Sequence, residues 1–272
     1  MSRYDYVAVG HVTRDVLADG SSRAGGTALY SGLQAARLGL RTLILTQGRR
    51  EEIELLLAPW RDELDVKVLP AAQTTTLATR GAGEHRSQRL LSWAGEMTEP
   101  PIPRCSILHW AGIARELPNL GESDDCVITP QGLLRHWRAR TGEIYLAPLP
   151  EELLPERFSA AVLSHHEHAY CGPLLAAARR CGACVAVTAG ERAATLHLAD
   201  GGVLAAPAPA PVHPREDLGA GDVFAAAFFI ALGEGLEPTA AASFANTAAA
   251  VRIGGIGAEA IGTRAQIEAV LG

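Results

Sequence analysis

The sequence predicts an α/β fold of three layers, with a mainly parallel central sheet covered by helices on both faces. The first observation behind this prediction is an alternation of short apolar runs and longer helical patterns along most of the chain. The second is that the short runs are almost continuously apolar, as expected for parallel strands buried on both sides. A chain of 272 residues without a repeat, a low-complexity linker or a second core suits one domain over residues 1–272.

The strands and helices can be assigned in chain order. Strands are expected at residues 6–9, 41–46, 106–111, 125–128, 143–146, 160–163 and 184–188, each of them short and apolar. Helices are expected at residues 27–38, 53–64, 132–140, 170–181, 222–233, 238–252 and 264–271, with Gly39 ending the first. Strands separated by helices are joined by right-handed crossovers, which makes neighbouring strands parallel.

Two segments interrupt this alternation. Residues 13–25 are polar and rich in turn formers, and within residues 74–94 two β-prone stretches flank the turn Gly81-Ala82-Gly83. Together they predict a small β lid formed from about residues 13–25 and 74–94. A lid of this kind can close over a substrate and exclude water, which matters when hydrolysis competes with group transfer. An ordinary solvent-facing hairpin is the alternative.

Composition excludes several classes of function. The formal net charge of −6, with no basic stripe, argues against nucleic-acid binding. Lys67 is the only lysine, so the chain lacks a Walker-type phosphate loop and must hold phosphates with backbone amides, arginines and metal. No apolar run has membrane-spanning length, the first residues are too short for a signal peptide, and five cysteines are an odd number. We therefore expect a cytoplasmic protein with no membrane partner.

The segment 217–228 carries the most chemistry. Gly219, Ala220 and Gly221 lead into Asp222 and then into a dense apolar helix. Small residues let backbone amides approach an anion, and the positive end of the following helix adds to the attraction. A carboxylate beside a phosphate cradle can accept the proton of an alcohol during phosphoryl transfer. A plain turn before a buried helix is the alternative reading of this segment.

A second acidic residue is expected near the same edge of the sheet. Asp15 follows the first strand closely, and ligands of open α/β sheets bind at the carboxyl ends of the strands. There it can accept hydrogen bonds from two hydroxyls of a polyol, although a turn or a helix cap would also explain it. Gly25 and Gly26 open the first helix and permit close approach of a ligand.

The segments 25–39 and 217–222 resemble the ribokinase-like (PfkB) carbohydrate kinases, and similar motifs are dispersed in the same order from residue 10 to beyond residue 257. The resemblance implies a ribokinase-like fold and Mg²⁺-assisted transfer of the γ-phosphoryl group of ATP to a hydroxyl of a sugar or cyclic polyol. It assigns Asp222 as the base. It also implies that Asp15, near the N-terminus, and Gly25 and Gly26, at the start of the first helix, bind the acceptor.

The same resemblance implies which residues bind the phosphoryl donor and Mg²⁺. The run 187–190 is similar to a strand-end T-x-G motif, which implies that Thr188 and Gly190 contact the nucleotide. Asn246 falls where the family often lines the adenine pocket. Glu167 matches the acid of an N-x-x-E motif that organises Mg²⁺, which implies an indirect role through water.

The chain departs from the family at four positions. Tyr30 stands where the family usually has a sugar-binding Asn, and Ser164 replaces the Asn of N-x-x-E. Glu216 and Asp217 precede the glycine turn where Asp and Thr are usual. These departures leave open a non-catalytic ligand-binding or regulatory protein on the same scaffold.

Short matches at residues 74–76, 86–88 and 129–135 resemble the inositol-kinase-like branch, so we expect an inositol-like acceptor slightly ahead of a simple sugar. Asp15 favours neutral hydroxyls and would repel a phosphate. Only Arg86 and Arg89 on the lid are candidates to compensate such a charge. A nucleoside kinase is a further alternative, and the resemblance makes a homodimer through the lid plausible.

Overall fold

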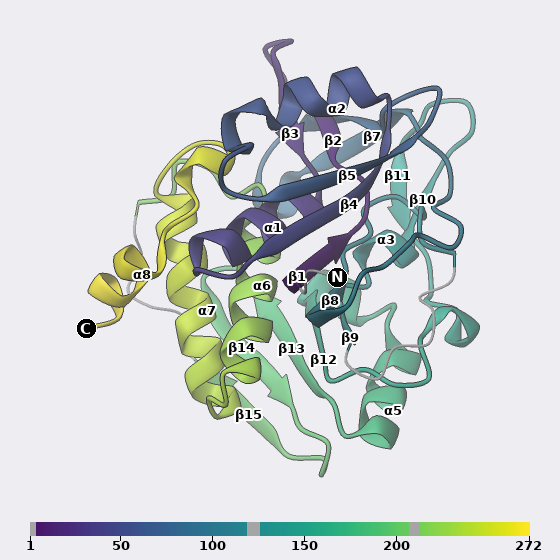
Figure 1. Cartoon of the computed structure of the whole chain (residues 1–272). Helices are drawn as coiled ribbons and strands as arrows, with labels where there is room; N and C mark the ends of the chain where they lie inside the picture. Colours follow the sequence, from purple (N-terminus) through teal and green to yellow (C-terminus); the bar gives the residue numbers. More distant parts are fainter. Residues whose placement is uncertain (1–3, 119–125, 207–212) are drawn as a thin grey trace.

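The computed structural model describes residues 4–118, 126–206 and 213–272. Its main element is a nine-stranded sheet in the order β15-β14-β13-β12-β9-β8-β1-β4-β5 (Figure 1). The strands are β1 (Tyr4–Val9), β4 (Thr42–Gly48), β5 (Asp65–Pro70), β8 (Cys105–Trp110), β9 (Cys126–Ile128), β12 (Ala160–Ser164), β13 (Cys184–Ala189), β14 (Arg192–His197) and β15 (Val203–Ala206). All neighbours from β5 to β13 are parallel, and β14 and β15 are antiparallel. The predicted α/β fold with a mainly parallel sheet is confirmed.

Side chains of the central strands alternate between two buried faces, which explains their continuous apolar sequence. In β1, Tyr6 and Ala8 join one core cluster, and Val7 and Val9 join the other. The first cluster is covered by α1 (Thr27–Arg37), α2 (Arg50–Leu57), α6 (Ala220–Gly233), α7 (Pro238–Ile253) and α8 (Arg264–Leu271). The second is covered by α3 (Gln131–Leu134) and α5 (Gly172–Cys181), which completes the three layers.

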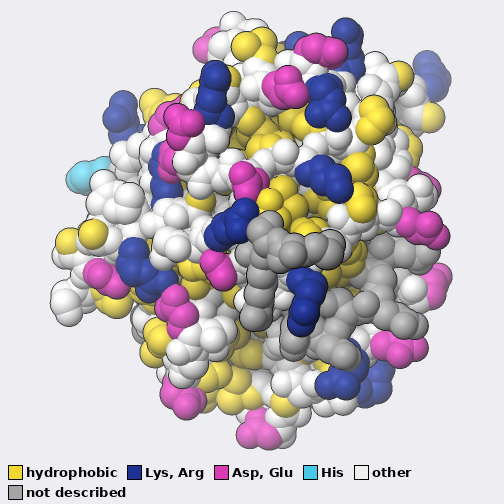
Figure 2. All heavy atoms as spheres, viewed as in Figure 1, with side chains coloured by type: hydrophobic (Ala, Val, Ile, Leu, Met, Phe, Trp, Pro, Cys, Tyr) yellow, Lys and Arg dark blue, Asp and Glu magenta, His cyan; other side chains and the backbone are white. Residues whose placement is uncertain are grey.

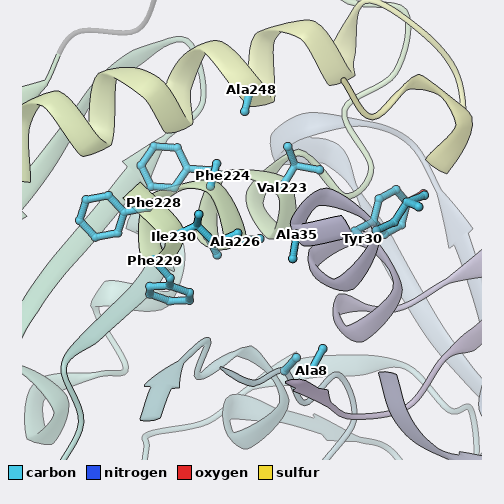
Figure 3. Packing of buried hydrophobic residues seen from close by; sticks show 14 of the residues in the cluster. Ala8, Tyr30, Ala35, Val223, Phe224, Ala226, Phe228, Phe229, Ile230 and Ala248 are labelled. Atoms are coloured by element: carbon cyan, nitrogen blue, oxygen red, sulfur yellow. The ribbon is translucent and has the colours of Figure 1, made fainter. Parts of the chain in front are cut away.

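Helix α6 is apolar on all sides because it is enclosed on all sides. Figure 3 shows it between α7 and the sheet, with α1 beside it. Residues Val223 to Ala231 are all buried, and the rings of Phe224 and Phe228 are stacked with centroids 5.8 Å apart. Burying one such ring stabilises the fold by about 1.5–3 kcal/mol. The packing fixes the first turn of α6, which carries the residues expected to bind and transfer phosphate.

A second, four-stranded sheet has the order β3-β2-β6-β7, and we call it the lid sheet. It consists of β2 (Thr13–Val16), β3 (Ser22–Gly25), β6 (Thr76–Arg80) and β7 (Ser87–Ser92). The short helix Gly83–His85 connects β6 to β7. A two-stranded sheet of β10 (Arg135–Trp137) and β11 (Ile144–Leu146) adjoins it through a bridge between Arg89 and Glu143. The two segments that interrupt the sequence pattern therefore form one sheet.

The structure corrects several predicted elements. The helix predicted at residues 132–140 ends at Leu134, because the next three residues pair with β11 and Trp137 packs on Trp93 at 5.4 Å. The helix predicted at 53–64 runs from Arg50 to Leu57, since Pro59 cannot donate a helical hydrogen bond. The strand predicted at 143–146 lies outside the central sheet, and Asp125, the first residue of another, is outside the described residues. The sequence does not predict β5, β10, β14 and β15, and β2 and β3 are predicted only as parts of the lid, without their bounds.

The surface carries charges of both signs. Figure 2 shows basic side chains (Lys and Arg, dark blue) and acidic side chains (magenta) interspersed over the face seen in Figure 1. Among the helices in the described part of the chain, none combines the length and apolar character needed to cross a membrane.

Candidate active site

A cleft of about 370 Å³ lies where the lid sheet faces the carboxyl ends of β12 and β13. Residues that are distant in sequence meet there, from the lid, from α1, from the central strands and from the start of α6. Of the predicted site residues, eleven line it: Asp15, Gly26, Tyr30, Arg86, Glu167, Thr188, Gly190, Gly219, Ala220, Gly221 and Asp222. Gly25 and Asn246 are not among its lining residues.

The glycine turn at the start of α6 has the geometry of an anion site. Gly219 has φ of 83°, and a Cβ there would lie 2.3 Å from Cδ1 of Tyr30, so only glycine fits. The amide of Ala220 already donates to the Asp217 carbonyl at 3.2 Å. Within the described residues, no acceptor is present for the amides of Gly219 and Gly221, so these two remain for an anion at the helix N-terminus.

Asp222 is the third residue of α6 and is half-buried beside this turn. Burial raises the pKa of its carboxyl to about 6, and the negative charge of Glu167 acts in the same direction. The Thr27 hydroxyl and the charges of Arg135 and Arg86 oppose this rise. A carboxylate with a pKa near 6 is deprotonated at neutral pH and is still basic enough to accept the proton of a hydroxyl.

Asp15 faces the cleft from strand β2 of the lid sheet, and only 3% of its surface is exposed. The Thr13 hydroxyl donates to its Oδ1 at 2.7 Å. Burial raises the pKa of Asp15 to about 6. The hydrogen bond from Thr13 and the positive charge of Arg23 lower the pKa and so partly oppose this rise. Gly25 lies directly behind it, because a Cβ there would be 2.1 Å from Asp15 Oδ2. Gly25 therefore makes room for the carboxylate and does not itself line the cleft.

The start of α1 forms the wall between Asp15 and the glycine turn. Gly26 is its N-cap, with φ of 96°, and a Cβ there would lie 2.4 Å from the carbonyl oxygen of His11. Tyr30 is 1% exposed and packs against Gly219, with the Arg252 guanidinium 5.4 Å from its ring centroid. No described residue hydrogen-bonds to the Tyr30 hydroxyl. Where the family usually has an amide, this chain therefore has a ring that supports the anion turn.

Glu167 and Ser164 form a capping box at the carboxyl end of β12. Glu167 Oε2 accepts from the Ser164 amide at 2.7 Å and from the Ser164 hydroxyl at 2.9 Å, and the Glu167 amide donates back to that hydroxyl. This arrangement orients the carboxylate in the cleft wall near Asp222. Among the described residues no group of three or more His, Cys, Asp or Glu side chains forms a metal cage.

The end of β13, where the donor is expected to bind, forms another part of the cleft wall. Thr188 donates to the carbonyl of Leu163 at 3.4 Å, and Gly190 has φ of 63° with open space at its Cβ position. Asn246 lies elsewhere, in α7, where its amide donates to the Ala206 carbonyl of β15 at 3.0 Å. Thr188 and Gly190 therefore line the cleft. Asn246 connects α7 to the edge strand β15 through its hydrogen bond.

Arg135 is a cleft residue that the sequence reasoning missed. It was assigned to a helix, but as the first residue of β10 it is half-buried in the cleft wall. Burial lowers the pKa of its guanidinium, and the negative charges of Glu167, Asp222 and Asp15 counteract this. A cation among three carboxylates is placed to attract a phosphoryl group. The signals in the sequence were the short match at residues 129–135, which ends at this arginine, and the Leu-Leu pair before it.

Glu116 was missed as well, and it holds the loops under the cleft. Its carboxylate is fully buried and accepts from the amides of His11 at 2.9 Å, Ile113 at 2.8 Å and Ala114 at 2.6 Å. These bonds join the loop after β1 to the loop after β8, and Ile113 lines the cleft. Glu116 therefore shapes the site without facing it.

Sequence comparisons found a matching family and a related protein. A model of the pfkB family carbohydrate kinases matches residues 125–264. Ribokinase of Bacillus subtilis (strain 168) is 45% identical over 62 residues, which is 22% of this chain and only 21% of the length of that relative.

Solved structures of low sequence identity share the fold. One is a pyrophosphate-dependent kinase in the ribokinase family complexed with a pyrophosphate analog and myo-inositol; it has a TM-score of 0.75 and 19% identity, with 94% of this chain and 98% of that chain covered. Another is Arabidopsis thaliana ribokinase complexed with ribose and ATP, with a TM-score of 0.73, 16% identity and 99% of each chain covered. The family match spans more than half of the sequence and includes the anion turn and Asp222, so this chain belongs to the pfkB family of carbohydrate kinases.

Proposed function

We propose that the protein transfers the terminal phosphoryl group of a donor, with ATP as the first candidate, to a hydroxyl of a neutral sugar or cyclic polyol. An inositol-like ring is the favoured acceptor. One observation carries the proposal: the anion turn at Gly219–Gly221, the basic carboxylate of Asp222 and the buried carboxylate of Asp15 meet in one cleft from distant parts of the chain.

In this mechanism the acceptor ring is held by Asp15, which accepts hydrogen bonds from its hydroxyls, and lies against the Gly26 backbone. Asp222 takes the proton of the reacting hydroxyl, so that its oxygen can attack phosphorus. The amides of Gly219 and Gly221 and the guanidinium of Arg135 stabilise the charge on the phosphoryl group in transit. Lid residues exclude water, which would otherwise be phosphorylated in place of the acceptor.

Mg²⁺ fits the oxygen donors of this site. Mg²⁺ prefers one or two carboxylates together with waters and substrate phosphates to a cage made wholly of protein ligands. Glu167 would hold the ion through water, with its own orientation fixed by Ser164. The ion would neutralise charge on the donor phosphates.

Charge pairing supports a neutral acceptor. The two lid arginines considered for an acceptor phosphate are both engaged: Arg86 forms an ion pair with Asp217, and Arg89 donates to the Thr141 carbonyl at 2.8 Å. Asp15 would repel a phosphate nearby. A structural neighbour that binds myo-inositol adds weight to an inositol-like ring.

Pyrophosphate is a second candidate donor. The position of Asn246 favours it, because this residue contacts β15 and does not line the cleft, although the family often uses it for adenine. A structural neighbour is named as pyrophosphate-dependent. Phosphate groups bound by Gly219, Gly221, Thr188 and Gly190 are common to both donors, so the cleft accommodates either.

The test is a matrix of donors and acceptors under one condition. Mg-ATP and Mg-pyrophosphate are each combined with myo-inositol, ribose, fructose, fructose 6-phosphate and adenosine, and kcat/KM is measured for every pair. We expect the highest value with a neutral polyol. A preference for adenosine would indicate a nucleoside kinase, and polyol binding without turnover with either donor would indicate a non-catalytic protein.

A further inference from the structure

Two adjacent carboxylates before the anion turn tie the lid to the catalytic loop. Asp217 pairs with Arg86 through Oδ1, and its Oδ2 accepts from the Gly83 amide at 2.8 Å. Glu216 pairs with Arg23 of β3 and with Arg252, whose Nη2 lies 3.0 Å from Glu216 Oε2. We call the Asp217–Arg86–Gly83 contacts the latch.

The latch lies at the acceptor end of the cleft. Arg86 and Asp217 both line it, and the charge of Arg86 lowers the pKa of both Asp15 and Asp222. The guanidinium is therefore close enough to act on the two carboxylates that hold and deprotonate the acceptor. Asp217 is half-buried, so solvent screens its pairing with Arg86 only in part.

Arg86, a cationic residue of the cleft lining, is thus paired with an acid of this chain. We propose that Asp217 determines specificity, by neutralising Arg86 so that the cleft accepts a neutral hydroxyl ring and rejects a phosphorylated one. This inference rests on the proposed function. Without the negative charge of Asp217, the planar fork of Arg86 becomes a receptor for a phosphate carried by the acceptor.

Asp217→Asn is the direct test, because the amide oxygen can still accept from Gly83 while the charge is lost. The measured quantity is kcat/KM for fructose 6-phosphate divided by kcat/KM for fructose, two acceptors that differ only in the phosphate. We expect this ratio to rise at least tenfold over the unmodified protein. The rise should disappear in Asp217→Asn/Arg86→Gln, since the guanidinium that the first substitution releases is then absent. Asp200→Asn removes the same charge from an exposed turn and should leave the ratio unchanged.

Binding provides a readout that does not depend on turnover. Calorimetric titration with inorganic phosphate should show at least tenfold tighter binding to Asp217→Asn than to the unmodified protein, again only when Arg86 is present. If Asp217→Asn does not fold, Asp217→Thr introduces the residue usual in the family and serves for the same measurements.

The outcomes separate this inference from the proposed function. A parallel fall in kcat/KM for both acceptors, with unchanged phosphate affinity, would show that Asp217 only holds the lid in place and would overturn the inference. Absence of kinase activity in the unmodified protein would refute the proposed function, and the phosphate titration would still decide whether Asp217 masks Arg86.

Discussion

Gly219→Ala tests the geometry of the anion turn through protein stability. A non-glycine residue at φ of 83° costs about 1–2 kcal/mol. The new Cβ would also lie 2.3 Å from Tyr30 Cδ1, whereas carbon atoms pack at roughly 3.5–4.0 Å. Tyr30 is 1% exposed, so overpacking adds about 1–3 kcal/mol. We therefore expect Gly219→Ala to destabilise the fold by about 2–5 kcal/mol.

Thermal and urea unfolding measure this loss of stability. A second substitution, at Tyr30, separates the cost of the positive φ from the cost of overpacking. At roughly 2 °C per kcal/mol for a chain of this size, Tm should fall by about 4–10 °C. In a Tyr30→Ala background only the cost of the positive φ remains, so the coupling free energy between the two positions should be about 1–3 kcal/mol.

Gly221→Ala is the matched control, because no atom lies within 4 Å of its Cβ position. A helical Ala is more stable than Gly by up to about 1 kcal/mol, so Tm should hold or rise while the added methyl group impedes donor binding. Equal destabilisation by Gly219→Ala with and without Tyr30 would refute the packing argument.

Three further predictions concern catalysis. Asp222→Asn should lower kcat by on the order of 10² or more with Tm and donor binding preserved, because the amide cannot accept the proton; near-normal turnover would remove Asp222 as the base. Since the base must be deprotonated and its pKa is raised to about 6, kcat/KM should fall as pH drops through about 6; a flat profile between pH 5 and 8 would contradict this. Arg135 lowers the pKa of Asp222, so Arg135→Gln should shift this acidic limb to higher pH as well as reduce kcat. An unshifted limb would mean that the charge of Arg135 does not act on Asp222.

Local sequence determined the elements whose signals do not depend on neighbours. The continuous apolar runs of β1, β4, β8, β12 and β13 predict buried parallel strands, and the structure confirms them. The glycine turn before α6 was also readable, because a positive φ and an exposed helix N-terminus are properties of a few consecutive residues. By contrast, β5 and β14 lie toward the sheet edges and are partly exposed, so their sequences lack a continuous apolar run.

Tertiary structure alone decided which charges meet. Arg135 faces the cleft because its segment pairs with β11, a contact that its own helical pattern does not reveal. Arg86 was considered a receptor for a substrate phosphate, but folding places it against Asp217, which is 131 residues away in sequence. The hydrogen bond of Asn246 to the Ala206 carbonyl of β15 is likewise invisible in the sequence, and its predicted contact with the donor stays a prediction. Composition and motifs fix which groups a chain carries, whereas the pairing of long charged side chains depends on distances that only the folded backbone sets.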